Sequence, residues 1–201
     1  MGTQTENLLA HMATRTGFDI AYADVREAQL AALAERFEEG RDTIKLVRQR
    51  AEDAGIASIR TLQDIVPLLL PHTAYKSYPE SVLTGKKWDR LTRWLGSITP
   101  LPVDRIALDG VEDVDGWIAA CEAAGISVSC TSGTTGKPAM LPASDDDLAF
   151  AAREGVEAVQ WASAIRAGDA RTVAGFGATA QTSRNAANGG ALISAFCDFS
   201  K

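Results

Sequence analysis

The chain has 201 residues, of which 46% are hydrophobic, and its formal net charge at pH 7 is −6. Such a chain can bury a substantial core in one large domain or two small ones, and its acidic balance, with no basic cluster, argues against nucleic acid and anionic membranes as partners. No apolar run is long enough to span a bilayer, and three scattered cysteines without metal-ligand or disulfide spacing favour a cytoplasmic protein with no metal site.

The first half of the chain is predicted to be helical. Residues 25–39 carry apolar side chains at helical spacing, and Gly40 is predicted to end this helix because glycine readily takes the conformation that closes one. Asp42 is predicted to cap a second helix, which Gly55 closes. Two helices with a short turn between them should therefore occupy residues 25–54.

Two further helices are predicted before the middle of the chain. Thr61 is predicted to cap a short helix that ends before Pro67. Residues 86–95 form the next helix, with four large apolar side chains on one side: Trp88, Leu91, Trp94 and Leu95. Core packing is the preferred interpretation of this stripe, and the lining of an acyl pocket is the alternative.

An irregular segment, residues 71–79, separates these helices and carries aromatic side chains. Tyr75 and Tyr78 are interpreted as packing against the domain, with contact to a substrate as the alternative. The two histidines, His11 and His72, do not stand in sequence contexts that mark the base of a catalytic triad. The sequence therefore assigns no catalytic residue.

The second half of the chain alternates helices and strands. Residues 116–124 are predicted to form a helix that Gly125 stops. Residues 126–130 alternate as a strand does, and residues 139–141 are predicted to return as a second strand. Strands that are separated by helices predict an α/β fold.

The loop between these two strands carries the strongest functional signal in the chain. It reads Thr-Ser-Gly-Thr-Thr-Gly-Lys-Pro over residues 131–138. Glycines let successive N–H groups converge on an anion, hydroxyls add donors, and a lysine adds a compact positive charge. A glycine-rich surface turn is the alternative. The residues predicted to bind a polyphosphate are Thr131, Ser132, Gly133, Thr134, Thr135, Gly136 and Lys137.

A long helix is predicted to follow over residues 145–165, with Ser144 as its cap. Aspartates occupy residues 145–147 in its first turn, where the helix dipole favours negative charge. We prefer this explanation to a Mg²⁺ site. Residues 171–176 are predicted to form a further strand and residues 185–199 a further helix.

The loop resembles the phosphate loop of the adenylate-forming superfamily of acyl-CoA ligases, and its Gly-Lys-Pro order is similar to that of the phenylacetate–CoA ligase branch. It departs from the usual pattern of the superfamily because the lysine precedes Pro138, and Ala139 stands where a lysine usually follows. It also differs from the common P-loop, in which Ser or Thr follows the lysine. Further similarities at residues 48–65 and 166–190 extend the resemblance over residues 40–200.

The resemblance implies ATP-dependent activation of a carboxylic acid to an acyl-adenylate, followed by transfer to a thiol such as CoA. ATP and Mg²⁺ are the implied cofactors. The implied partners are a small-molecule carboxylate and the thiol of CoA, of a carrier or of a protein. Phe176 and Gly177, at the end of the predicted strand, are expected to line the acyl pocket, with core packing of Phe176 as the alternative.

The resemblance also implies the N-terminal part of the large domain of such an enzyme, with a helical region over residues 1–100 and an α/β region with the phosphate loop over residues 101–201. Later motifs of the superfamily do not occur in these 201 residues: an aromatic-x-x-Thr-Glu segment, a ribose-binding aspartate and a C-terminal lysine. We therefore expect a part of a longer ligase that does not catalyse adenylation alone. If such a part leaves one edge of its hydrophobic core exposed, that edge would favour association into a homodimer.

Two other functions stay open from the sequence. An acyl-protein synthetase uses the same half-reactions and passes the acyl group to a protein or a carrier. A non-catalytic nucleotide-binding module would keep the loop without the chemistry. All three functions share the predicted phosphate contacts at residues 131–137.

Overall fold

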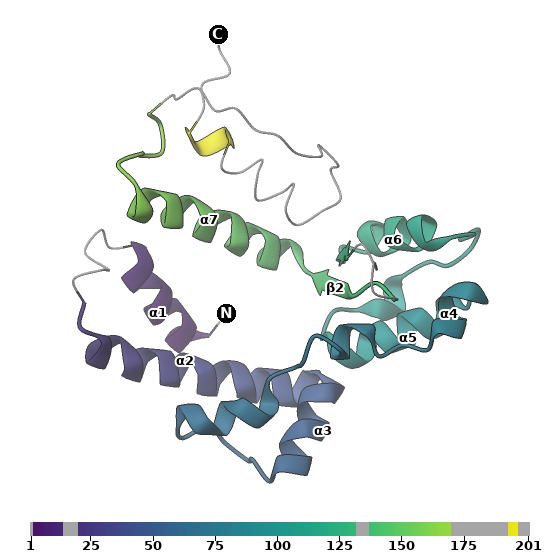
Figure 1. The fold of residues 1–201 in the computed structure, drawn as a ribbon, viewed down its shortest axis with the longest axis horizontal. Coiled ribbons are helices and arrows are strands. Elements are labelled where there is room, and N and C mark those ends of the chain that lie inside the picture. The colour runs from purple at the N-terminus through teal and green to yellow at the C-terminus, as the bar shows by residue number, and fades with distance from the viewer. Residues whose placement is uncertain (1, 14–19, 132–136, 170–192, 197–201) are drawn as a thin grey trace. The chain divides into compact units, whose positions relative to one another are not determined.

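The computed structural model describes residues 2–13, 20–131, 137–169 and 193–196 (Figure 1). Helices dominate this part of the chain, and its strands form one antiparallel pair. The fold is therefore mixed α/β in the broad sense and mostly helical, with helices in the first half and both helices and strands in the second, as the sequence predicts. Among the described helices, none is long and apolar enough to cross a membrane.

The chain divides into two compact units. The first consists of Met1–Ser77 and Arg93–Pro100, and the second of Tyr78–Thr92 and Leu101–Lys201. Each unit is thus built from two separate stretches of the chain.

The first unit is built from helices around a small apolar core. Its elements are α1 (Thr3–Ala13), α2 (Tyr22–Thr43), α3 (Lys45–Ala54) and the short 3₁₀ helices η2 (Leu62–Leu68) and η3 (Ala74–Lys76). Four buried side chains make the core: Phe37, Ala51, Ile59 and Leu68. They come from α2, α3, η2 and the turn before η2, so burial of apolar surface holds these elements together.

Helix α2 runs past Gly40 to Thr43, so the predicted end of this helix is wrong. The guanidinium of Arg48 on α3 donates to two backbone carbonyls in the last turn of α2, at 3.2 and 2.7 Å. These bonds satisfy carbonyls that a helix end leaves without partners, and they support the turn beyond the glycine. Asp42 therefore lies inside α2 instead of capping α3, and Ile44 occupies the cap position.

Two other boundaries in this unit follow the local sequence signals, and a third does not. Gly55 closes α3 with a φ of 67°, as predicted. Thr61 precedes η2, and its backbone N–H donates to the carboxylate of Asp64 at 2.8 Å. The predicted end of η2 before Pro67 is wrong, because the helix includes this proline and ends at Leu68. Arg50 donates to the Pro67 carbonyl at 3.0 and 2.6 Å and so secures this end.

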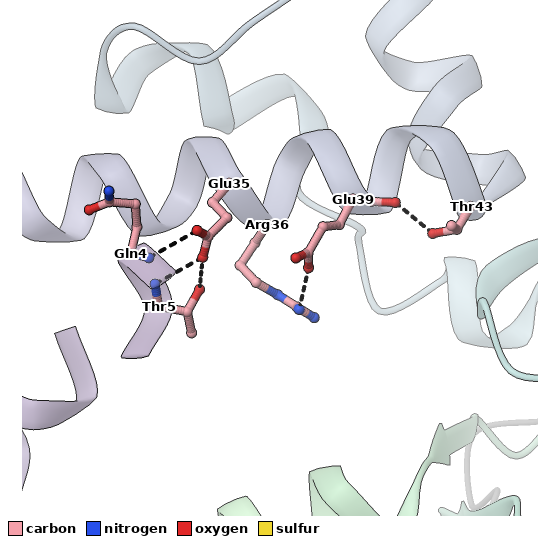
Figure 2. A network of polar contacts seen from close by, with 6 residues as sticks. All are labelled: Gln4, Thr5, Glu35, Arg36, Glu39 and Thr43. Atoms are coloured by element: carbon pink, nitrogen blue, oxygen red, sulfur yellow. Dashed lines mark hydrogen bonds and ion pairs between the residues drawn. The ribbon is translucent and has the colours of Figure 1, made fainter. Parts of the chain in front are cut away.

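Helix α1 begins against a carboxylate from α2. Figure 2 shows Glu35 accepting hydrogen bonds from the N–H groups of Gln4 and Thr5, both at 2.9 Å, and from the Thr5 hydroxyl at 2.7 Å. The first N–H groups of a helix lack partners within it and carry the positive end of its dipole. The bond from Gln4, followed by those from Thr5, therefore lowers the pKa of Glu35 below its usual 4.5.

We expect Glu35→Gln to destabilise the protein at neutral pH and to have less effect in acid. A carboxylate with a lowered pKa stabilises the fold above its unfolded pKa, and this contribution is lost as the pH falls through the folded pKa. Urea unfolding from about pH 7 to about pH 3 should show the difference between wild type and variant shrinking. Glu39→Gln is the matched control, because Glu39 lies on the same helix and pairs with Arg36 at an exposed position (Figure 2). A pH-independent effect of Glu35→Gln would contradict the assignment.

Helix α5 (Trp88–Ile98) contributes residues to both units. Trp88, Leu91 and Leu95 are buried, as core packing predicts. Trp94 is half-buried, and its indole Nε1 donates to the hydroxyl of Ser77 at 2.8 Å. The apolar stripe therefore packs in the structure, and its alternative role in an acyl pocket stays a prediction.

The second unit also contains α4 (Glu80–Thr84), the 3₁₀ helix η4 (Val103–Arg105) and α6 (Val114–Ala123). Helix α6 matches the predicted helix closely. The Asp113 carboxylate accepts from the Gly116 N–H at 2.8 Å, and Gly125 follows the helix with a φ of 78°. Trp117 is fully buried, and its indole Nε1 donates to the Thr92 hydroxyl on α5 at 2.9 Å. This bond links α6 to the first turns of α5.

Strands β1 (Ser127–Cys130) and β2 (Met140–Ala143) pair antiparallel, as predicted, with Cys130 opposite Met140. Helix α6 packs against β1, and α7 (Asp145–Ala162) follows β2 (Figure 1). The cap of α7 is confirmed: Ser144 Oγ accepts from the Asp147 N–H at 3.1 Å, and the Asp147 carboxylate accepts from the Ser144 N–H at 2.9 Å.

Two predicted elements near the C-terminus fall largely outside the described residues. The strand predicted at 171–176 lies wholly outside them. Of the helix predicted at 185–199, the structure describes residues 193–196, which are helical. Helix α7 ends at Ala162, earlier than predicted, and Ser163 takes an extended conformation there.

Candidate functional site

The candidate site is the connection between β1 and β2, and its two ends are joined by hydrogen bonds. The Thr131 N–H donates to the Ala139 carbonyl at 3.0 Å. The Ala139 N–H donates in return to the Thr131 hydroxyl at 2.8 Å. Because the strands pair antiparallel up to Cys130 and Met140, these bonds close the connection at a narrow neck. Thr131 and Lys137 are thus brought close to the same neck from opposite ends of the loop.

Among the described residues, Tyr78 holds the ammonium group of Lys137. Lys137 Nζ donates to the backbone carbonyl of Tyr78, and it lies 5.0 Å from the centroid of the Tyr78 ring. A cation at this distance from an aromatic face is attracted to it. A lysine ammonium carries three N–H donors, so one bond to a carbonyl leaves donor capacity for an anionic oxygen.

Tyr78 also binds the exit of the loop. It is fully buried, and its hydroxyl donates to the Pro138 carbonyl at 2.7 Å. Burial, and to a lesser extent the nearby Cys130 thiol, raises the pKa of Tyr78 to about 12. The phenol therefore keeps its proton at neutral pH and remains a donor.

Two cysteines are close to the loop in the fold. Cys130 ends β1 and is exposed. The pKa of its thiol is nevertheless raised, mainly because the surrounding protein partly shields it from water and secondarily by the negative charge of Asp115. Cys121 on α6 is fully buried, and this burial raises its pKa to about 12. Because the thiolate is the nucleophilic form, neither thiol is prepared for covalent catalysis.

The structure describes only the two ends of the predicted phosphate loop. Thr131 and Lys137 have the positions given above. Residues 132–136, which include Ser132, Gly133, Thr134, Thr135 and Gly136, lie outside the described residues. Phe176 and Gly177, the predicted lining of the acyl pocket, lie outside them as well, so their roles stay predictions.

Aspartates occupy residues 145–147 in the first turn of α7, and one of them caps the helix. Asp147 belongs to the reciprocal cap with Ser144. Within the described ranges, no three His, Cys, Asp or Glu side chains gather where they could hold a metal ion. The cap thus explains Asp147, and the preference for the helix dipole over a Mg²⁺ site at residues 145–147 stays a prediction.

Tyr78 is the functional candidate that sequence reasoning did not connect to the loop. The sequence predicts it as a packing residue, and it is one. Its bonds to Lys137 and Pro138, however, span 59 and 60 positions in the sequence. No local pattern could have shown this contact, because only the folded chain brings the two segments together.

A concave feature lies in the first unit. It is a pocket of about 310 Å³ between the start of α2 and the start of η2, lined by Ala23, Arg26, Glu27, Leu30, Arg60, Thr61, Leu62 and Gln63. Its charged side chains have both signs and are exposed.

Comparison of the chain with protein-family models, with curated proteins and with solved structures gave no match.

Proposed function

We propose that this chain binds the phosphate tail of ATP at residues 131–137 and serves in the activation of a carboxylic acid, as part of an adenylate-forming enzyme similar to phenylacetate–CoA ligases. The ordered string from Thr131 to Pro138 is the observation that carries the proposal. The structure supports it by placing this string between two paired strands, with a threonine and a lysine at its neck.

The proposed loop acts on the outer phosphates. In the adenylation half-reaction, a carboxylate oxygen attacks the α-phosphorus of ATP, and the bond to pyrophosphate breaks. Hydroxyls, backbone N–H groups and the Lys137 ammonium would hold the departing β- and γ-phosphates and neutralise their charge. In the second half-reaction, a thiolate attacks the acyl carbon and releases AMP.

The acceptor thiol in this proposal comes from outside the described part of the chain. Cys121 and Cys130 have raised pKa values, which keeps their thiols protonated. CoA, a carrier or another protein would supply the thiol. Both cysteines are free, in keeping with the reducing cytoplasm in which we place this activity.

Mg²⁺ is the metal that such a reaction employs, where it neutralises phosphate charge. The described residues do not fit a site of their own for it, because they offer no cluster of carboxylates. We therefore assign no residue to the metal.

The proposal is tested by titrating the chain with ATP, inorganic tripolyphosphate and AMP at constant ionic strength. ATP and tripolyphosphate should bind with similar affinity, and AMP should bind at least about tenfold more weakly, because two charged phosphate groups are missing. Equal binding of ATP and AMP, or no binding of tripolyphosphate, would refute a site for the outer phosphates.

The acid-activating role requires a second measurement. A complete ligase that contains this chain should exchange pyrophosphate into ATP only when its carboxylic acid is present. Binding of tripolyphosphate without such exchange would favour the alternative, a non-catalytic nucleotide-binding module.

A further inference from the structure

We propose that Tyr78 is a positioning residue that aligns Lys137 for the phosphates; this inference rests on the proposed function and adds a residue from outside the loop motif. Tyr78 lies 59 positions before Lys137, directly before Pro79, which precedes α4. It contacts the loop through three separate groups: its backbone carbonyl, its ring and its hydroxyl.

The first two contacts restrict the lysine side chain itself. The backbone carbonyl accepts a hydrogen bond from Lys137 Nζ, and the face of the ring attracts the same ammonium. A lysine has a flexible four-carbon stem, so an ammonium without such contacts would sample many positions. Together the carbonyl and the ring keep the charge at the neck of the loop, where Thr131 meets Ala139.

The third contact fixes the backbone that carries the lysine. The Tyr78 hydroxyl donates to the carbonyl of Pro138, the residue after Lys137, at 2.7 Å. Proline has a fixed φ, so a bond to its carbonyl sets the direction in which the chain leaves the loop. Since Tyr78 is fully buried, it is a rigid reference for both the backbone and the ammonium.

Two substitutions separate these contacts. Tyr78→Phe removes the hydroxyl bond and keeps the ring and the carbonyl, whereas Tyr78→Leu removes the ring as well. We expect tripolyphosphate to bind about three- to tenfold more weakly to Tyr78→Phe, in proportion to the loss of one hydrogen bond, and more weakly still to Tyr78→Leu. If Tyr78→Leu does not fold, the phenylalanine variant alone decides the result.

A purely structural role for Tyr78 predicts a different outcome. Thr92→Val is the control, because Thr92 is buried in the same unit and bonds to Trp117 instead of the loop. This control should lose stability and keep the affinity of the wild type for tripolyphosphate. Equal affinity of wild type and Tyr78→Phe would overturn the inference and leave the proposed function standing. Failure of the wild type to bind tripolyphosphate would remove the proposed function itself.

A measurement without ligand tests the same alignment. Acetic anhydride labels accessible lysines, and mass spectrometry reports the rate for each one. Lys137 should react more slowly than the exposed Lys87 in the wild type. Its rate relative to Lys87 should rise several-fold in Tyr78→Leu, which loses the ring, and less in Tyr78→Phe, which keeps it. An unchanged ratio in Tyr78→Leu would show that the Tyr78 ring does not hold the ammonium.

Discussion

Replacing Lys137 with methionine should weaken the binding of tripolyphosphate by about tenfold to a hundredfold. A hydrogen bond to a charged group contributes about 1.5–3 kcal/mol, and methionine keeps most of the length of the side chain while removing the ammonium. Isothermal titration at constant ionic strength would measure the change. ATP should lose affinity by a similar factor, because the loop is proposed to hold the phosphates that the two ligands share.

Lys87→Met is the matched control for this experiment. Lys87 is an exposed lysine in the same unit and lies outside the loop motif in the sequence. Its substitution therefore removes one positive charge without changing the loop. We expect its tripolyphosphate affinity to stay close to that of the wild type. Equal losses in both variants would indicate a general electrostatic effect and would contradict a specific site at Lys137.

Replacing Trp117 with alanine should destabilise the protein by about 3–5 kcal/mol. Trp117 is fully buried on α6, so its loss removes a large apolar surface and leaves a cavity. The Thr92 hydroxyl also loses its indole donor. Urea unfolding followed by circular dichroism would measure the change in the free energy of unfolding.

Two further variants identify the source of this effect. Thr92→Val leaves the buried Trp117 Nε1 without its partner and should cost about 1–3 kcal/mol. Ala119→Gln, at an exposed position on the same helix, should change stability by less than about 0.5 kcal/mol. If Trp117→Ala were no more destabilising than Ala119→Gln, the packing of α6 in the second unit would be incorrect.

Several elements of the fold follow from short sequence signals alone. Ser144 and Asp147 cap α7 reciprocally, and Gly55 and Gly125 follow helices in the left-handed conformation that glycine adopts readily. The strand that ends at Cys130 was also predictable. In each case the groups that determine the structure are within a few residues of one another, so the local sequence contains the whole interaction.

Other boundaries could not be predicted locally. Helix α2 continues past Gly40 because Arg48 binds its last carbonyls, and η2 continues past Pro67 while Arg50 binds the carbonyl of that proline. The start of α1 likewise depends on Glu35, which lies 30 positions away. Helix propensities describe the conformation that a segment prefers by itself. Hydrogen bonds from other segments can override a preference against the helix of about 1 kcal/mol.

The sequence by itself determined the chemical content of the candidate site: hydroxyls, glycines and one ammonium group in a loop between two strands. Only the tertiary structure decided where that ammonium lies and which residue holds it. Tyr78 reaches Lys137 and Pro138 from a distant part of the chain. The physical reason is that such a contact forms only after folding has buried the tyrosine next to the loop, and no spacing or composition in the sequence records that event.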